Sequence, residues 1–170
     1  ARRGAGALYP DGTRLVAAKL DQAVFTGANM AGARLDRAAL AQANLSQADL
    51  SGARLYQAIL TGANLDSANL SQATLTQADL TDAQLPSADL SGAVLSRAIL
   101  ENAVLRGSSL RGAKLDGANL LSADFTGADL AEATLADARM DGARFTDAKL
   151  DSTIWVNRQR CRPGSVGECR

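Results

Sequence analysis

Large apolar residues recur at every fifth position through most of this chain. They occupy every fifth position from Leu15 to Trp155, and nearly all of them are leucine. Alanine stands two residues before each of them from Ala18 to Ala148, and Ser108 is the one exception. An α-helix advances about 100° per residue, so side chains five residues apart would scatter around its circumference. The period therefore excludes an amphipathic helix.

The same period predicts short extended segments joined by corners. Alanine and the apolar residue two positions later point to one side of an extended segment, so both can face inward. Ten of the fifteen glycines stand two positions after a central apolar residue, where a type II turn requires a positive φ. Gln, Arg, Asp and Ser in the same position of other repeats predict other turn types. Ser and Thr dominate the preceding position, where a hydroxyl can bond neighbouring backbone.

Four such corners close a square of twenty residues, and the twenty-nine central positions from Leu15 to Trp155 give about seven coils. One coil buries too few apolar side chains to offset the ordering of its backbone, so the coils must stack. The sequence therefore predicts an all-β solenoid.

The repeats carry a family resemblance. The run from 43 to 55, Ala-Asn-Leu-Ser-Gln-Ala-Asp-Leu-Ser-Gly-Ala-Arg-Leu, resembles the pentapeptide-repeat family, whose consensus is A(D/N)LXX. The resemblance implies a right-handed quadrilateral parallel β-helix, and the handedness rests on the resemblance alone. We expect an N-terminal cap segment over 1–12, the β-solenoid over 13–155 and a short C-terminal capping tail over 156–170.

The two ends of a solenoid expose apolar side chains and unpaired strand edges, so both need caps. We expect Tyr9 to cover the first coil and Trp155 to close the last. Cys161 and Cys169 flank a short polar loop, and we expect a disulfide between them in an oxidising compartment. The alternative is a pair of free thiols in the cytoplasm. The ending Thr-Ile-Trp resembles cyanobacterial and plastid family members, which favours the thylakoid lumen or a periplasm.

Charge and composition exclude several classes of function. The chain has 18 basic and 18 acidic residues and no histidine, so no strong overall field attracts nucleic acid or an anionic membrane. No apolar run approaches the roughly 18 residues that suggest a membrane span. Without histidine, a Gly-rich phosphate loop or an irregular insertion that builds a pocket, we expect no enzyme, catalytic residue, metal or cofactor.

The residue between each alanine and leucine points outward, and residues twenty apart should form vertical rows. One row contains Arg14, Arg34 and Arg54 and is partly basic. Another row alternates Asn with Asp. Its carboxylates Asp49 and Asp89 should lie about 10 Å apart, too far to share a metal ion. We expect this second row to be a solvated face on which the alternation avoids adjacent like charges.

Apolar outward residues form the candidate docking surface. Val94, Ile99 and Val104 fall on three successive sides of one coil, and Ile59 lies two coils below Ile99. Exposed apolar side chains can mark a docking site. The alternative is that β-branched residues pack against neighbouring coils on a strand-like surface.

These observations favour a monomeric, non-enzymatic structural or protein-interaction module with an unidentified protein partner. The alternative comes from the resemblance, because some family members mimic B-form DNA, bind DNA gyrase and confer quinolone resistance. The repeats from 13 to 155 contain sixteen acidic and twelve basic residues, a net charge of −4. Duplex DNA of equal length, about 34 Å, carries roughly 20 negative charges. The charge therefore disfavours the DNA mimic.

Overall fold

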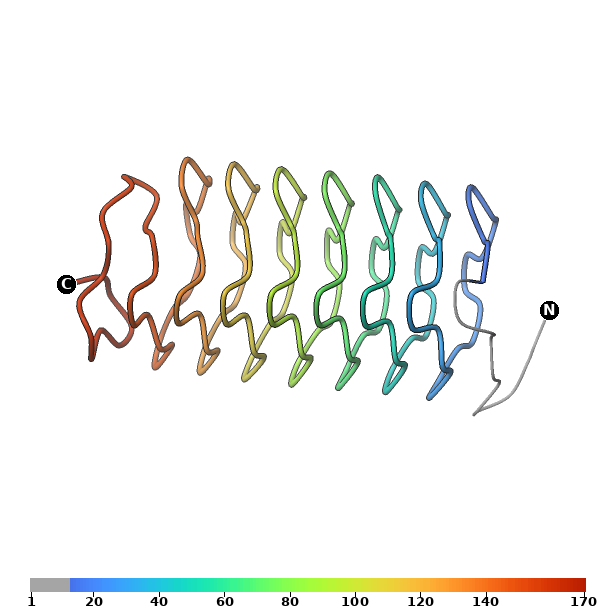
Figure 1. Ribbon diagram of the computed structural model, residues 1–170, viewed down its shortest axis with the longest axis horizontal. Helices are drawn as coiled ribbons and strands as arrows, with labels where there is room; N and C mark the ends of the chain where they lie inside the picture. The colour runs from blue at the N-terminus through green and yellow to red at the C-terminus, as the bar shows by residue number, and fades with distance from the viewer. Residues whose placement is uncertain (1–12) are drawn as a thin grey trace.

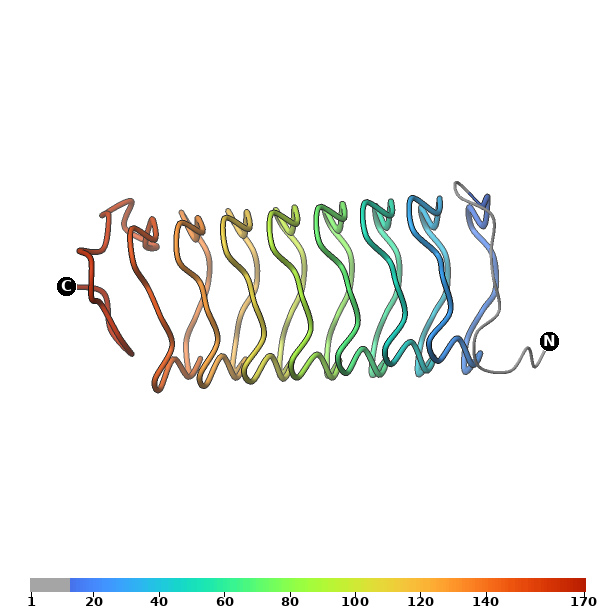
Figure 2. The ribbon, with the colours of Figure 1, turned by 60° about the horizontal axis from the view of Figure 1, so that its bottom comes forward.

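The computed structural model describes residues 13–170 (Figure 1). Within this range the chain forms no helix and no strand longer than a single bridge residue. Parallel β-bridges instead connect residues twenty positions apart, from Arg14 with Arg34 to Thr134 with Ile154. Figures 1 and 2 show the resulting turns of chain stacked side by side along one axis, with the coil that begins at residue 13 at one end and the C-terminus at the other. The chain is a β-helix.

The bridges arrange the outward residues in four ladders, named A to D. Ladder A consists of Arg14, Arg34, Arg54, Thr74, Val94, Lys114, Thr134 and Ile154. Ladder B consists of Lys19, Ala39, Ile59, Asp79, Ile99, Asn119 and Arg139. Ladder C consists of Val24, Asn44, Asn64, Gln84, Val104, Asp124 and Arg144. Ladder D consists of Asn29, Asp49, Asn69, Asp89, Ser109, Asp129 and Lys149.

The corners between ladders share one backbone conformation. The carbonyl of each central residue accepts a bond from the N–H three residues later, as between Leu40 and Ala43 at 3.0 Å. The residue before that N–H has positive φ at every corner from Ala17 to Ser152. This holds for glycine and equally for other residues, such as Gln42 with a φ of 57°. This is the pattern of a type II turn. The expectation of other turn types at non-glycine corners is therefore wrong.

Bonds between coils explain why non-glycine residues accept this conformation. The N–H of Gln42 donates to the Thr61 carbonyl of the next coil at 2.9 Å, and Gly62 donates in the same way to Thr81 at 2.8 Å. A left-handed conformation costs a non-glycine residue about 1 to 2 kcal/mol. The regular ladder of backbone bonds offsets that cost, because any other turn would break the register of the stack.

The inward positions form one continuous core. The central residues from Met30 to Leu135 and the alanines between them are buried. The exception Ser108 is also buried, and its hydroxyl donates to the Leu105 carbonyl at 2.7 Å. Serine replaces alanine here because the turn supplies an acceptor for its only donor.

The C-terminal tail reverses direction and pairs with the last coil. Antiparallel bridges join Lys149 to Val166 and Ile154 to Arg160. The N–H of Leu150 donates to the Ser165 carbonyl at 2.9 Å. The tail thus supplies backbone partners to the ends of ladders D and A, which would otherwise be open edges.

A disulfide and an aromatic column complete this end. Cys161 and Cys169 are joined, with sulfur atoms 2.07 Å apart. The Trp155 ring meets Phe145 edge to face at 5.1 Å, and Phe145 stacks on Phe125 at 5.0 Å. Trp155 therefore lies at the end of the apolar core. The expected cap residue Tyr9 falls in 1–12, outside the described residues.

Candidate interaction surfaces

Outward Asp and Asn side chains hold the corners in place. The Oδ1 atom of Asp49 accepts the Ser51 N–H at 2.9 Å, and the same contact recurs at other outward Asp and Asn residues of all ladders except A. At Asp79, the Thr81 hydroxyl also donates to this oxygen, at 2.7 Å. The hydroxyl therefore donates to a side chain here, whereas the sequence predicted a bond to neighbouring backbone. These Asp and Asn residues stabilise corners.

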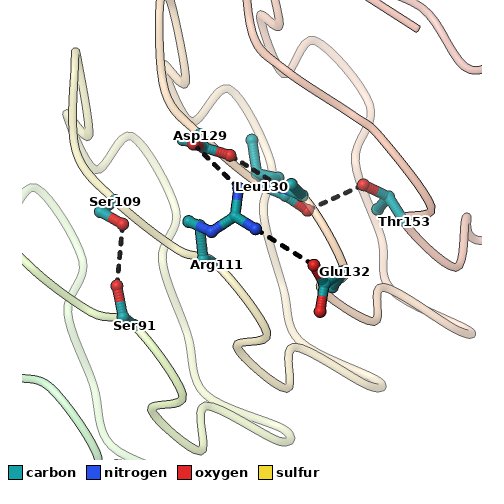
Figure 3. A network of polar contacts seen from close by, with 8 residues as sticks. Ser91, Ser109, Arg111, Asp129, Leu130, Glu132 and Thr153 are labelled. Atoms are coloured by element: carbon teal, nitrogen blue, oxygen red, sulfur yellow. Dashed lines mark hydrogen bonds and ion pairs between the residues drawn. The ribbon is translucent and has the colours of Figure 1, made fainter. Parts of the chain in front are cut away.

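Ladder D is a hydrogen-bonded polar face. Asn69 donates its amide N–H to Asp49 Oδ1 at 3.2 Å, so at this pair the alternation of Asn and Asp provides a hydrogen bond as well as charge separation. Further along, Arg111 reaches Asp129 at 3.4 Å and Glu132 at 3.1 Å (Figure 3). Within residues 13–170, no three His, Cys, Asp or Glu side chains are placed to hold a metal ion.

Ladder C contains one buried carboxylate. Asp124 accepts a bond from Arg106 Nε at 2.6 Å and lies 3.8 Å from Arg144. Burial of Asp124 raises its pKa, but hydrogen bonds from Thr126 and Arg106 outweigh burial and lower the pKa from 3.8 to about 2. The ionised carboxylate therefore stabilises the fold.

We expect Asp124→Asn to remove about 2 kcal/mol of stability at neutral pH, because its pKa is lower in the folded state than in the unfolded chain. The wild type has this contribution above pH 4 and loses it as the pH falls from about 4 to about 2. Urea denaturation at several pH values measures the difference. If wild type and variant lose stability in parallel over that range, Asp124 is not its source.

The candidate docking residues lie on three ladders. Ile59 and Ile99 share ladder B and are 46% and 38% exposed, but Asp79 is bridged between them. Val94 on ladder A and Val104 on ladder C are half-buried. The structure therefore does not gather the four residues into one flat patch. It places Val94, Ile99 and Val104 around three sides of one coil.

Ladder A carries a basic surface near its N-terminal end. Arg14, Arg34 and Arg54 are consecutive members of the ladder. The corner residue Asp36 adds a carboxylate to this surface, since its Oδ2 atom lies 3.5 Å from Arg54 Nε. A shallow, open pocket of about 260 Å³ is lined by Val16, Arg34, Asp36, Arg37, Arg54, Tyr56 and Gln57. Sequence reasoning identified the arginine row but missed the corner residues, since their side chains were assigned only to turning.

The sequence matches the family profile described as pentapeptide repeats, in 8 copies, over residues 11–47, 43–82, 88–127 and 119–154. The chain belongs to the pentapeptide-repeat family. This membership agrees with the repeat period and with the β-helix of the structure. No match was found among curated proteins.

Solved structures of other pentapeptide-repeat proteins resemble this one. HetL, involved in heterocyst differentiation regulation in the cyanobacterium Nostoc, is 29% identical with a TM-score of 0.55, over 88% of this chain and 86% of HetL. A pentapeptide-repeat protein from the cyanobacterium Cyanothece is 38% identical with a TM-score of 0.50, over 57% of this chain and 63% of its own. The plasmid-mediated fluoroquinolone resistance protein QnrB1 is 17% identical with a TM-score of 0.53, over 89% and 79%. That last similarity shows the shared fold alone.

The described residues of this pentapeptide-repeat protein contain no helix long and apolar enough to cross a membrane.

Proposed function

We propose that this pentapeptide-repeat protein is a non-enzymatic protein-interaction module, built as a right-handed quadrilateral β-helix of about seven coils. The observation that carries the proposal is the unbroken series of bridges from Arg14 to Ile154. Each bridge fixes an outward side chain about 4.8 Å from its neighbour in the next coil. A surface ordered before binding loses little conformational freedom when a partner docks, and this favours affinity.

The docking surface we propose consists of Ile59, Val94, Ile99 and Val104. The exposure of Ile59 and Ile99, on a ladder whose other members are polar except Ala39, supports it. A partner would contact it by covering ladder B and reaching across the corners on either side to Val94 on ladder A and Val104 on ladder C. We propose that the protein works as a monomer.

The disulfide between Cys161 and Cys169 supports an oxidising compartment, the thylakoid lumen or a periplasm. A gyrase-binding DNA mimic gains no support from the ladders. Ladder A presents three consecutive positively charged arginines, whereas the phosphate backbone of DNA carries negative charge alone.

Replacing Val94, Ile99 and Val104 together by threonine tests the docking surface. We expect the melting temperature to stay within a few degrees, because these outward side chains are not part of the core. We expect the variant to lose capture of a partner that the wild type retains from lumenal or periplasmic extract. Pull-down with mass spectrometry measures capture, and calorimetry measures melting.

The matched control places threonine at Ala39, Gln84 and Lys114, three outward positions on the same three ladders. This control should capture the partner as the wild type does. If the variant with threonine at positions 94, 99 and 104 melts at a much lower temperature but still captures the partner, Val94, Ile99 and Val104 serve packing between coils.

A further inference from the structure

The last coil has unpaired backbone groups where ladder B ends. One coil earlier, Leu120 donates its N–H to the Arg139 carbonyl at 2.7 Å, and the Arg139 N–H donates to the Ala118 carbonyl at 2.9 Å. The equivalent groups of the last coil are the Met140 N–H and the Ala138 carbonyl, and within residues 13–170 neither is bonded to another backbone group. Unpaired groups at such an edge are a template for pairing with another chain.

The C-terminal tail covers other parts of this edge and leaves this part open. At the corner before ladder B, the Val156 carbonyl accepts from the Asp137 N–H at 3.1 Å. At the corner after ladder C, a Cβ on Gly167 would lie 3.8 Å from the Asp147 nitrogen. Between these two contacts, the N–H of Gly142 has no backbone partner among the described residues, and Gly142 is exposed. Because glycine consists of backbone alone, its exposure makes the edge accessible at this corner.

Apolar side chains are uncovered at the same place. Met140 and Ala143 pack against the core but stay partly exposed. Their equivalents one coil earlier, Leu120 and Ala123, are fully buried. Arg139 projects outward beside them on ladder B, is exposed, and forms no ion pair among the described residues. The edge therefore combines apolar surface with backbone donors, a backbone acceptor and a positive charge.

We propose that this edge binds an extended segment of a protein partner, which pairs with it in parallel as one further repeat. An acidic residue of that segment donates its N–H to Ala138, accepts from Met140 and places its carboxylate beside Arg139. The next residue is apolar and covers Met140 and Ala143, and the carbonyl after it accepts from Gly142. An inorganic anion or a phosphate backbone offers acceptors alone, so the Ala138 carbonyl would stay unpaired. The inference rests on the proposed role in protein interaction.

Two features of this end disfavour a second copy of the chain as the occupant. A copy stacked in register would place Lys19, the first member of its ladder B, against Arg139, and like charges in such a ladder destabilise pairing. The tail also occupies the ends of ladders D and A, where Lys149 is bridged to Val166, so a flat coil cannot approach all four sides. A single extended segment meets neither obstacle.

Nitrogen-15 NMR of the backbone amides of the full chain tests the proposal. The probe is acetyl-Ala-Asp-Leu-Ser-Gly-Ala-amide, which has the sequence of residues 88–93. We expect saturable shifts of the Met140 and Gly142 amides, and no comparable shift of the Leu120 amide, which is already bonded in the stack. N-methylation of the peptide's aspartate removes the N–H that Ala138 accepts and keeps the charge. It should weaken binding by about fivefold or more.

Charge reversal tests the register of the segment. Arg139→Glu should weaken binding of this peptide by about fivefold or more, and a peptide with lysine in place of aspartate should bind that variant as the original peptide binds the wild type. Lys149→Glu is the matched control, because Lys149 is an outward base of the same coil at a ladder end that the tail already pairs. It should leave the affinity unchanged, and neither variant should melt earlier.

Equal binding of the N-methylated peptide, or an unchanged affinity of Arg139→Glu, would overturn the proposal. Exchange of the Met140 and Gly142 amides in the free protein as slow as that of Leu120 would also overturn it, because the edge would then be covered already. Shifts of these amides that grow with protein concentration alone would assign the edge to a second copy instead. If the peptide fails to bind while capture by the docking surface persists, only this inference falls and the proposed function stands.

Discussion

Leu65→Asp is expected to prevent folding of this protein, whereas Asn64→Asp is expected to change its stability little. Leu65 is fully buried, and its column contains Leu45 and Leu85 in the adjacent coils. An ionised carboxylate without a partner costs several kcal/mol or more in such an interior, and the burial of leucine, about 2 kcal/mol, is lost as well. Most domains are stable by only about 5 to 15 kcal/mol.

The neighbouring position is a matched control, because it receives the same new charge one residue away. Asn64 points outward, and its Oδ1 accepts the Asp66 N–H at 3.0 Å, a bond that aspartate can also accept. Circular dichroism during thermal melting compares the two variants with the wild type. Equal losses of melting temperature would contradict the alternation of inward and outward residues, and with it the coil.

Reduction of the disulfide is expected to loosen the C-terminal end well before the middle coils. A closed loop of this size contributes roughly 2 to 3 kcal/mol by restricting the unfolded tail. The tail also pairs with the last coil, since Cys161 donates its N–H to the Thr153 carbonyl at 2.8 Å and Gly167 donates to Ala148 at 2.9 Å. When the tail separates, these partners are lost and the last coil frays.

Intact mass should show one disulfide and no free thiol in the native protein. Hydrogen exchange with mass spectrometry should then show faster exchange over residues 135 to 155 after reduction, with residues 55 to 75 unchanged. Replacing both cysteines by serine should reproduce the reduced pattern without a reductant. Two cysteines that alkylate freely in native protein would remove the disulfide, and uniform acceleration in all coils would show that it stabilises the whole stack.

The five-residue period predicted the inward and outward positions, because burial in a repeat depends on position alone. It did not predict the backbone conformation of the corners that lack glycine. The expectation for non-glycine corners rested on the preference of a single residue. The conformation of Gln42 is instead set by the backbone bonds that the corners from Ala17 to Asp137 make to the next coil. In a stacked fold, the register of the neighbours overrides the preference of the residue.

The surfaces were predicted less completely than the core. The row of Arg14, Arg34 and Arg54 followed from the spacing of twenty, but the approach of Asp36 to Arg54 depends on how a corner side chain turns toward a ladder. The antiparallel pairing of the tail was also beyond prediction, since residues 156–170 have no period. Periodicity locates a residue on a coil and does not tell which neighbour its side chain reaches.

The bridge between residues twenty apart also decides how this protein can change length during evolution. An insertion of twenty residues adds one coil and leaves every ladder aligned. An insertion of five keeps each leucine inside, so the fold survives, but it moves all later outward residues around to the next side. Insertions whose length is not a multiple of five would carry leucines out of the core. A single repeat gained or lost between Arg14 and Arg34 would thus separate these two charges and present a different surface on the same scaffold.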